Sequence, residues 1–343
     1  MSFEEIKRII EEGFYVYDYE IIEKNVYRFF VYPKFGKESF GVLLRIPLEY
    51  KVESKYLYNE VVIEVKKEKE RKWINVLLFI ATVISTTLIG ATFYGEFNLV
   101  GGFVFSLAVM FVLGSHEMGH YFMARKWNMK TSLPYFIPFP TIIGTLGAII
   151  RYKGAIPNRK ALFDVGVAGP LVGILASVIV LYVGLKIPFK PPAAEGEVIL
   201  LGNSLLFSLV ANLAGFKSGN FVHPIAFAGW IGLFVTFINL IPVGQLDGGH
   251  ILRAMIGKYS DIVSRAIPFF LIIVGLTLRS YVSHFWVMWG LITMFFSLHP
   301  HPGPVDDKTP LDKKRYIVGI CTFALALSCF APEFIRYSKI HKL

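Results

Sequence analysis

Long apolar runs are the feature that most limits how this chain can fold. Residues 74–94 carry no charged side chain, and about 20 helical residues suffice to cross the hydrocarbon core of a bilayer. Further apolar runs cover residues 99–123, 161–184, 224–242, 268–278, 284–298 and 316–330. Hydrophobic residues make up 54% of the chain and charged residues only 17%, which favours a membrane protein over a soluble one. We therefore expect an α-helical polytopic membrane protein with about six to seven transmembrane helices.

One apolar segment does not fit a simple spanning helix. Residues 134–150 are interrupted by breakers, namely Pro134, Pro138, Pro140, Gly144 and Gly147. These residues disfavour a continuous helix. Non-helical backbone persists at membrane depth only where protein buries it or where it lines a wet cavity. We expect a re-entrant or β-like insert here.

The N-terminal part has a different pattern. Its first apolar side chains follow helical spacing, at Phe3, Ile6, Ile9 and Ile10. Short aromatic and β-branched runs, typical of strands, follow at residues 15–22, 26–32, 40–46 and 61–65. We expect residues 1–72 to form a small soluble α+β domain. Residues 73–343 would then form the transmembrane domain, with a core at about 75–300 and C-terminal helices at 301–343.

Positive charge is concentrated in alternate segments between the apolar runs. The net charge is +10, and Lys and Arg cluster at residues 66–72, 125–130, 151–160, 253–265 and 313–315. Such clusters mark cytoplasmic loops rather than a nucleic-acid surface, so we expect no nucleic-acid partner and a cytoplasmic N-terminal domain. Only the C-terminal tail, with Arg336, Lys339 and Lys342, falls on the opposite side, and one misassigned span would remove this conflict. The acidic start resembles neither a signal peptide nor an organelle transit peptide, so we expect a multi-pass protein of a prokaryotic plasma membrane.

A metal-binding pattern lies within the run at residues 99–123. It reads Ser115-His116-Glu117-Met118-Gly119-His120. Positions four apart lie on one helix face, so both imidazoles can bind one ion, and Glu117 can reach a bound water without binding the metal. Charged groups at membrane depth are costly unless they are paired or liganded, which favours a metal site over a chance interfacial turn.

A catalytic zinc takes three protein ligands and leaves one position open, so a third ligand must come from elsewhere. The best candidate is Asp247, in the segment Asn239-Leu240-Ile241-Pro242-Val243-Gly244-Gln245-Leu246-Asp247-Gly248-Gly249-His250. If the spans alternate, Asp247 and the histidine pair both lie in the cytoplasmic third of the membrane. Pro242 and the glycines open the helix there, which lets Asp247 turn inward. His250 is a candidate neighbour of the ligands.

The two patterns together resemble those of the site-2 proteases, which are intramembrane zinc metalloproteases. Residues 163–171, Phe-Asp-Val-Gly-Val-Ala-Gly-Pro-Leu, also look like a segment of that family, and the resemblance covers about residues 75–300. It implies a Zn²⁺ cofactor bound by His116, His120 and Asp247, with Glu117 as the catalytic base and Asn239 in a polar supporting role. It also implies cleavage of a substrate's transmembrane segment. The soluble N-terminal part is most similar to the subgroup that includes the chloroplast members.

The expected chemistry is endopeptidase cleavage of a transmembrane protein substrate within the lipid bilayer. Zinc lowers the pKa of its bound water to about 7, Glu117 takes the proton, and the water attacks the scissile carbonyl. Asn239 is a candidate donor to the substrate backbone or oxyanion, or else a helix-packing amide. The broken segment at residues 134–150 is a candidate edge for an extended substrate.

Two other functions fit parts of the pattern. In a cation or metal transporter, the same acidic and histidine side chains would line an ion path, although the inverted repeats of many transporters are not apparent. A catalytically inactive relative would bind membrane helices without cutting them, but such a protein has no need for Glu117. Asp164, the other intramembrane acid, is a candidate partner for a Lys or Arg near the cytoplasmic end, such as Arg159 or Lys160, or a candidate gate of the cavity, and we assign it no role.

Overall fold

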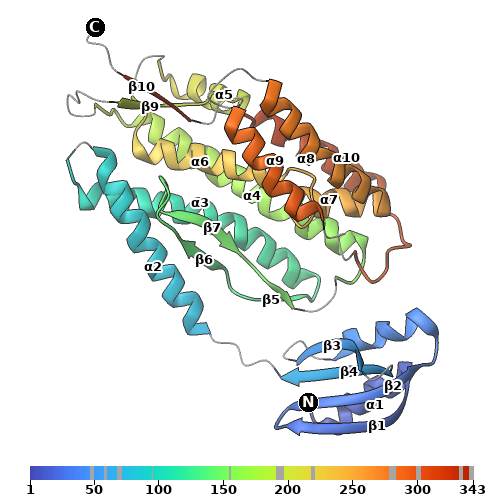
Figure 1. Cartoon of the computed structure of the whole chain (residues 1–343). Helices are drawn as coiled ribbons and strands as arrows, with labels where there is room; N and C mark the ends of the chain where they lie inside the picture. Colours follow the sequence, from blue (N-terminus) through green and yellow to red (C-terminus); the bar gives the residue numbers. More distant parts are fainter. Residues whose placement is uncertain are drawn as a thin grey trace.

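The chain folds into a small antiparallel sheet followed by a set of helices (Figure 1). The computed structural model describes residues 1–46, 50–57, 60–67, 72–94, 96–153, 156–190, 197–217, 221–277, 283–298, 303–331 and 335–339. The expected boundary at residue 72 falls beside residues 68–71, which lie outside this description, so the two-domain division stays a prediction.

The N-terminal region is a four-stranded antiparallel sheet in the order β1-β2-β4-β3. Its strands are β1 (Phe14–Glu23), β2 (Val26–Pro33), β3 (Tyr50–Leu57) and β4 (Glu60–Lys67). Helix α1 (Phe3–Gly13) begins with a capping box, in which Ser2 and Glu5 satisfy each other's backbone amides. Ile6 and Ile10 of α1 pack on Phe29 and Ile63 of the sheet, so this region has its own hydrophobic core.

The structure differs from the sequence prediction at two segments of this region. Residues 40–46 were expected as a strand, but they belong to the 3₁₀ helix η1 (Gly36–Arg45). This segment packs against the end of α1, where Gly13 leaves no room for a Cβ beside the Ser39 carbonyl. Strand β3 was missed because the charged side chains of Lys51, Glu53 and Lys55 alternate along it and hide its apolar positions.

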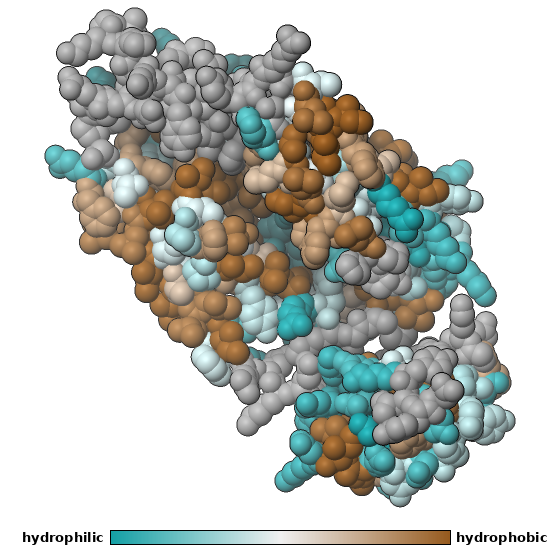
Figure 2. Space-filling view, viewed as in Figure 1, coloured by the Kyte–Doolittle hydropathy of each residue, from teal (hydrophilic) through white to brown (hydrophobic). Residues whose placement is uncertain are grey.

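Four helical stretches among the described residues are long and apolar enough to cross a membrane. They are α2 with the 3₁₀ turn η2 (Lys72–Tyr94), α3 (Leu99–Lys126), α4 (Arg159–Lys186) and the stretch Asp247–Thr277. The last stretch contains α7 (Asp247–Ile256), η3 (Gly257–Tyr259) and α8 (Ser260–Thr277). Their outer faces carry large apolar side chains, and Figure 2 shows hydrophobic surface over the helices and hydrophilic surface over much of the sheet. The chain is therefore a membrane protein with helical spans.

The remaining helices are shorter. They are α5 (Leu205–Ala214), α6 (Pro224–Asn239), α9 (Ser283–Ser297) and α10 (Lys313–Ser328). Helix α6 has only 16 residues, because the chain leaves the helix where Pro242 was expected to open it. The run predicted at 268–278 is the second half of α8, which begins at Ser260 and continues through Pro268.

Helix α4 lies at the centre of the helices and packs against α3, α6 and α7. Small residues let the backbones approach closely, as they do in other membrane proteins. A Cβ on Gly119 of α3 would lie 2.7 Å from the Ala168 carbonyl of α4. Gly184 of α4 and Gly229 of α6 have similarly little space, since a Cβ on either would overlap the backbone of the other helix. This tight packing fixes how α3, α4 and α6 lie relative to one another.

The segment between α3 and α4 contains short strands, as expected from its prolines and glycines. Strands β6 (Tyr135–Pro138) and β7 (Thr145–Ile149) form a hairpin, and β5 (Lys130–Thr131) pairs with β8 (Tyr152–Lys153). The side-chain amide of Asn75 on α2 donates to the carbonyls of Leu133 and Pro134. The hairpin is thus held beside α2 and α3 (Figure 1).

The C-terminal tail returns to the segment that follows α4. Strand β10 (Ile335–Lys339) pairs antiparallel with β9 (Glu197–Leu201) (Figure 1). The tail therefore lies at the end of the helices opposite to the start of α4. The side of the membrane on which Arg336 and Lys339 lie, and with it the topology of the last three helices, stays a prediction.

Candidate metal centre

Helix α3 brings His116 and His120 together. They lie one turn apart, both are buried, and their Nε2 atoms are 3.2 Å from each other. Buried imidazoles pointing at one another without a charge partner would be costly, so a third group is needed between them. Asp247 is that group.

Asp247 is the first residue of α7 and follows the non-helical segment 240–246. One carboxylate oxygen, Oδ2, lies 3.1 Å from His116 Nε2, and the other, Oδ1, lies 3.3 Å from His120 Nε2. The three ligand atoms lie within 4.8 Å of one another, and the described residues contain no second group of this kind. The convergence that the two sequence patterns required is therefore present.

The donor set fits a zinc ion. Two imidazole nitrogens and one carboxylate oxygen form a ligand set found in catalytic zinc sites. His120 has the supporting contact that such ligands need, since its Nδ1 lies 2.8 Å from the Val165 carbonyl. Donation from Nδ1 to that carbonyl leaves Nε2 free to bind a metal. The site residues are thus arranged for Zn²⁺ rather than merely adjacent in space.

Glu117 is buried beside the histidine pair but is outside the group of ligand atoms. The backbone N–H of Ile150, which follows strand β7, lies close enough to interact with its carboxylate. Tyr152 of β8 lies within electrostatic reach of both Asp247 and Glu117, and its ring meets His250 edge-on at 6.4 Å. Tyr152 was missed from the sequence because a two-residue strand leaves no recognisable pattern.

Two glycines of α4 make room for the histidines. A Cβ on Gly169 would overlap the His120 ring at Nε2, and a Cβ on Gly173 would lie 2.7 Å from His116 Nδ1. In the sequence, Gly169 stands out only as part of residues 163–171, the segment that resembles the family. Its physical role is to let the helix backbone lie directly against a ligand.

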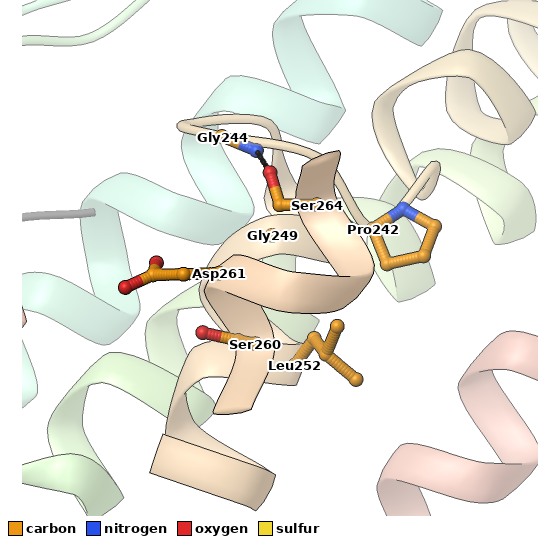
Figure 3. A pocket seen from close by; sticks show the side chains of 7 residues that line it. All are labelled: Pro242, Gly244, Gly249, Leu252, Ser260, Asp261 and Ser264. Carbon is orange, nitrogen blue, oxygen red and sulfur yellow. Dashed lines mark hydrogen bonds between the residues drawn. The ribbon is translucent and has the colours of Figure 1, made fainter. Parts of the chain in front are cut away.

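The segment before Asp247 is folded tightly between helices. Gly244 has a φ of +52°, which L side chains rarely adopt, and a Cβ there would lie 2.6 Å from the Phe296 carbonyl. The Gly244 amide donates to the Ser264 hydroxyl of α8 at 2.8 Å (Figure 3). The pocket in Figure 3 is lined by Pro242, Gly244, Gly249, Leu252, Ser260, Asp261 and Ser264. It lies between the segment around Asp247 and the start of α8, and His116, Glu117, His120 and Asp247 do not line it.

The other residues singled out from the sequence have varied positions. Asn239 is the half-buried last residue of α6, and its role stays a prediction. His250 packs beside Gly166 and Tyr152, close to the ligands. Asp164 pairs with an arginine, but this arginine is Arg315 rather than the two nearby examples, Arg159 and Lys160.

Arg159 is occupied elsewhere. Its guanidinium donates to the carbonyls of Ala254 and Met255 at the end of α7, each at 2.7 Å. Asp164 instead binds Arg315 of α10 through two hydrogen bonds of 2.7 Å, and it accepts one from Trp127 Nε1 at 3.1 Å. Proximity in sequence did not single out Arg315, because this residue lies far away along the chain.

Apolar helices that carry a buried His-Glu-x-x-His turn facing a distant aspartate define a membrane-embedded metallopeptidase centre. Comparison with known proteins agrees with this class. The family model for Peptidase family M50 matches residues 104–278, which is half of the chain. The chain belongs to Peptidase family M50, and the resemblance to the site-2 proteases is confirmed.

Curated plant proteins are similar to this chain. "Probable zinc metalloprotease EGY1, chloroplastic" of Arabidopsis thaliana is 33% identical over 230 residues, or 64% of this chain and 41% of that protein. "Probable zinc metalloprotease EGY2, chloroplastic" of the same plant is 31% identical over 237 residues, covering 66% and 41%. The rice protein named EGY1 is 40% identical over 152 residues, covering 42% and 26%. The chain therefore spans less than half the length of these relatives, and no solved structure matches it.

Proposed function

We propose that this chain is a zinc-dependent endopeptidase that cleaves peptide bonds within the membrane-spanning segments of other proteins. The observation that carries the proposal is the meeting of His116, His120 and Asp247 in one buried cluster, with Glu117 beside it. The relatives' names support zinc and peptidase chemistry. A transmembrane substrate is supported by the apolar helices α3 and α4 that surround the cluster.

In this proposal His116, His120 and Asp247 hold the zinc ion. When bound, the zinc ion would act as a Lewis acid: it would polarise the scissile carbonyl and lower the pKa of water to about 7. Glu117 takes a proton from the attacking water and later delivers it to the leaving amine. The Ile150 N–H near Glu117 helps to hold the carboxylate in place. Asn239 donates a hydrogen bond to the substrate backbone.

We also propose six to seven membrane spans and a cytoplasmic N-terminal domain at residues 1–72, in a prokaryotic plasma membrane. Contacts among the ends of three helices support the proposal that the basic clusters lie on one side of the membrane. The end of α3, the start of α4 and the start of α10 meet where Trp127 and Arg315 contact Asp164. Lys126, Arg159 and Lys313 are carried by the same ends. Such a concentration of positive charge is typical of the cytoplasmic side.

Strand β7 is the proposed docking edge for the substrate. It has one strand neighbour among the described strands, β6, and Ile150 just beyond it approaches Glu117. A helical substrate hides its carbonyls in internal hydrogen bonds, so it must unwind before cleavage. Pairing with β7 would hold it in extended form with its backbone exposed.

Cross-linking tests this edge. Cys321 and Cys329 are first replaced, and Leu146, an exposed residue of β7, is changed to cysteine. Disulfides are expected with cysteines at every second position of a substrate segment, because an extended strand repeats every two residues. Leu175→Cys, on an exposed part of α4, is the control and should not react. A repeat of three to four positions would mean that the substrate stays helical and does not add to β7.

Metal analysis tests the function itself. The purified full chain is expected to contain about one zinc per molecule, and His120→Ala should lose it together with cleavage of a transmembrane substrate. His284→Ala changes an exposed histidine at the start of α9 and should keep both. A wild-type chain that binds no zinc, or that moves metal ions into liposomes without cutting peptides, would contradict the proposal.

A further inference from the structure

Asp164 is an acid within a candidate membrane span, α4, that the proposed reaction does not use. It lies on α4 and is partly buried, with 19% of its side chain exposed. Both of its oxygens are engaged: Oδ1 accepts from Arg315 Nε, while Oδ2 accepts from Arg315 Nη2 and from Trp127 Nε1. A bidentate arginine–carboxylate pair fixes orientation as well as distance. Such a fixed carboxylate holds the part of α4 that carries it.

The groups that hold Asp164 come from two other helices. Trp127 is the C-cap of α3, the helix that carries both histidines. Arg315 lies in the first turn of α10 and also contacts Asp312, the N-cap of that helix. Arg315 is outside residues 104–278, the part of the chain that matches the family. Asp164 therefore links the centre of the family fold to a C-terminal helix of this chain.

The residue next to Asp164 supports a proposed zinc ligand. The Val165 carbonyl lies 2.8 Å from His120 Nδ1, and the contact is buried. A small rotation or slide of α4 would lengthen this hydrogen bond, because the carbonyl is part of the helix backbone. Partners of this kind fix the ring orientation and tautomer of a metal-binding histidine.

One backbone hydrogen bond of α4 is missing next to Val165. Pro170 lies inside α4 and has no N–H, so the hydrogen bond to the Gly166 carbonyl is missing and the turn is weakened. Gly166 and Gly169 add no side-chain contacts in the same turn. The Asp164–Arg315 pair therefore restrains this turn in addition to the packing of Val165 against Ala124 of α3.

We infer that Arg315 and Asp164 are positioning residues, which hold the Val165 carbonyl against His120 and thereby set the affinity of the metal centre. The inference rests on the proposed function, since it assumes that His120 binds zinc. It assigns to α10 a role in the metal centre, although α10 supplies no ligand. The Trp127 contact couples the same carboxylate to the end of α3.

The test measures zinc affinity of the full chain by competition with a chelator. Arg315→Ala and Asp164→Asn are each expected to weaken zinc binding about tenfold, at the lower end of the effect of losing a ligand's supporting contact. The double variant should be no weaker than either single variant, because the two residues act as one unit. Arg315→Lys keeps the charge but loses the bidentate geometry, so it should lie between wild type and Arg315→Ala.

Asp312→Asn is the matched control. It removes a second carboxylate partner of Arg315, while asparagine keeps the N-cap of α10. Zinc affinity should stay at the wild-type value. The absorption bands of the Co²⁺-loaded chain should shift in the Arg315 and Asp164 variants but not in this control. A merely structural ion pair would lower thermal stability without moving those bands.

Unchanged zinc affinity and Co²⁺ bands in Arg315→Ala or, if that variant does not fold, in Arg315→Lys would overturn the inference. Additive losses in the double variant would overturn it as well. The wild type is assayed in the same preparation for zinc and for cleavage of a transmembrane substrate. If the wild type shows both and the variants match it, only the positioning role fails. If the wild type shows neither, the proposed function fails first.

Discussion

Glu117→Gln is expected to reduce cleavage of a transmembrane substrate by about 10³-fold, within the range for loss of a general base. Glutamine has nearly the same size and shape as glutamate, but it cannot take a proton from water. Zinc content should be unchanged, because Glu117 is outside the group formed by His116, His120 and Asp247. The measurement compares initial cleavage rates and metal content of purified wild type and variant in the same detergent.

The control for loss of a carboxylate is Glu96→Gln, which changes an exposed residue between α2 and α3. Its cleavage rate should equal that of the wild type. If Glu117→Gln still cut at the wild-type rate, another group would have to be the base. Loss of zinc from Glu117→Gln would instead show that Glu117 holds the metal or its ligands, and that the two functions are not separate.

The metal centre was predictable because it depends on two short patterns. The four-residue spacing places His116 and His120 on one face of a helix, and their position in an apolar run made a third ligand necessary. Asp247 could be found because Pro242 and the flanking glycines break an apolar run next to an acid. In the structure the helix does end at Asn239, and Asp247 begins the next one.

Contacts between distant parts of the chain were not predictable in the same way. The sequence indicated a basic partner for Asp164, with Arg159 and Lys160 as nearby examples, but Arg159 binds the end of α7 and the partner is Arg315. Nothing within α4 or α10 alone indicates that they meet. The strand β3 was hidden for a related reason, since its apolar face becomes visible only once β4 lies beside it.

The roles of the glycines were only partly predictable from the sequence, as Gly169 shows. A glycine in an apolar helix has several common roles, including close packing and flexibility. Only the structure shows that this one faces Nε2 of His120, the atom proposed to bind zinc. The physical consequence is specific, because the missing side chain is what allows α4 to approach the ligand.

Gly169→Ala is therefore expected to abolish zinc binding and to reduce cleavage by at least about 100-fold, in line with damage to a ligand and its support. The new methyl group would overlap His120 at Nε2, the atom that points toward His116 and Asp247. Either the ring must rotate away from the metal position or α4 must move from α3. Movement of α4 would also stretch the hydrogen bond between Val165 and His120, so both routes disturb the same ligand.

Gly114→Ala separates this effect from a general effect of adding a methyl group to an intramembrane helix. Gly114 lies on α3, two residues before His116, and a Cβ there would meet only the Phe136 ring at 3.8 Å, an ordinary contact. Alanine also favours a helix more than glycine does. Gly114→Ala should therefore bind zinc and cut substrate as the wild type does. Normal zinc binding by Gly169→Ala would mean that His120 can bind the metal from another position, and that the close approach of α4 is not required for the centre.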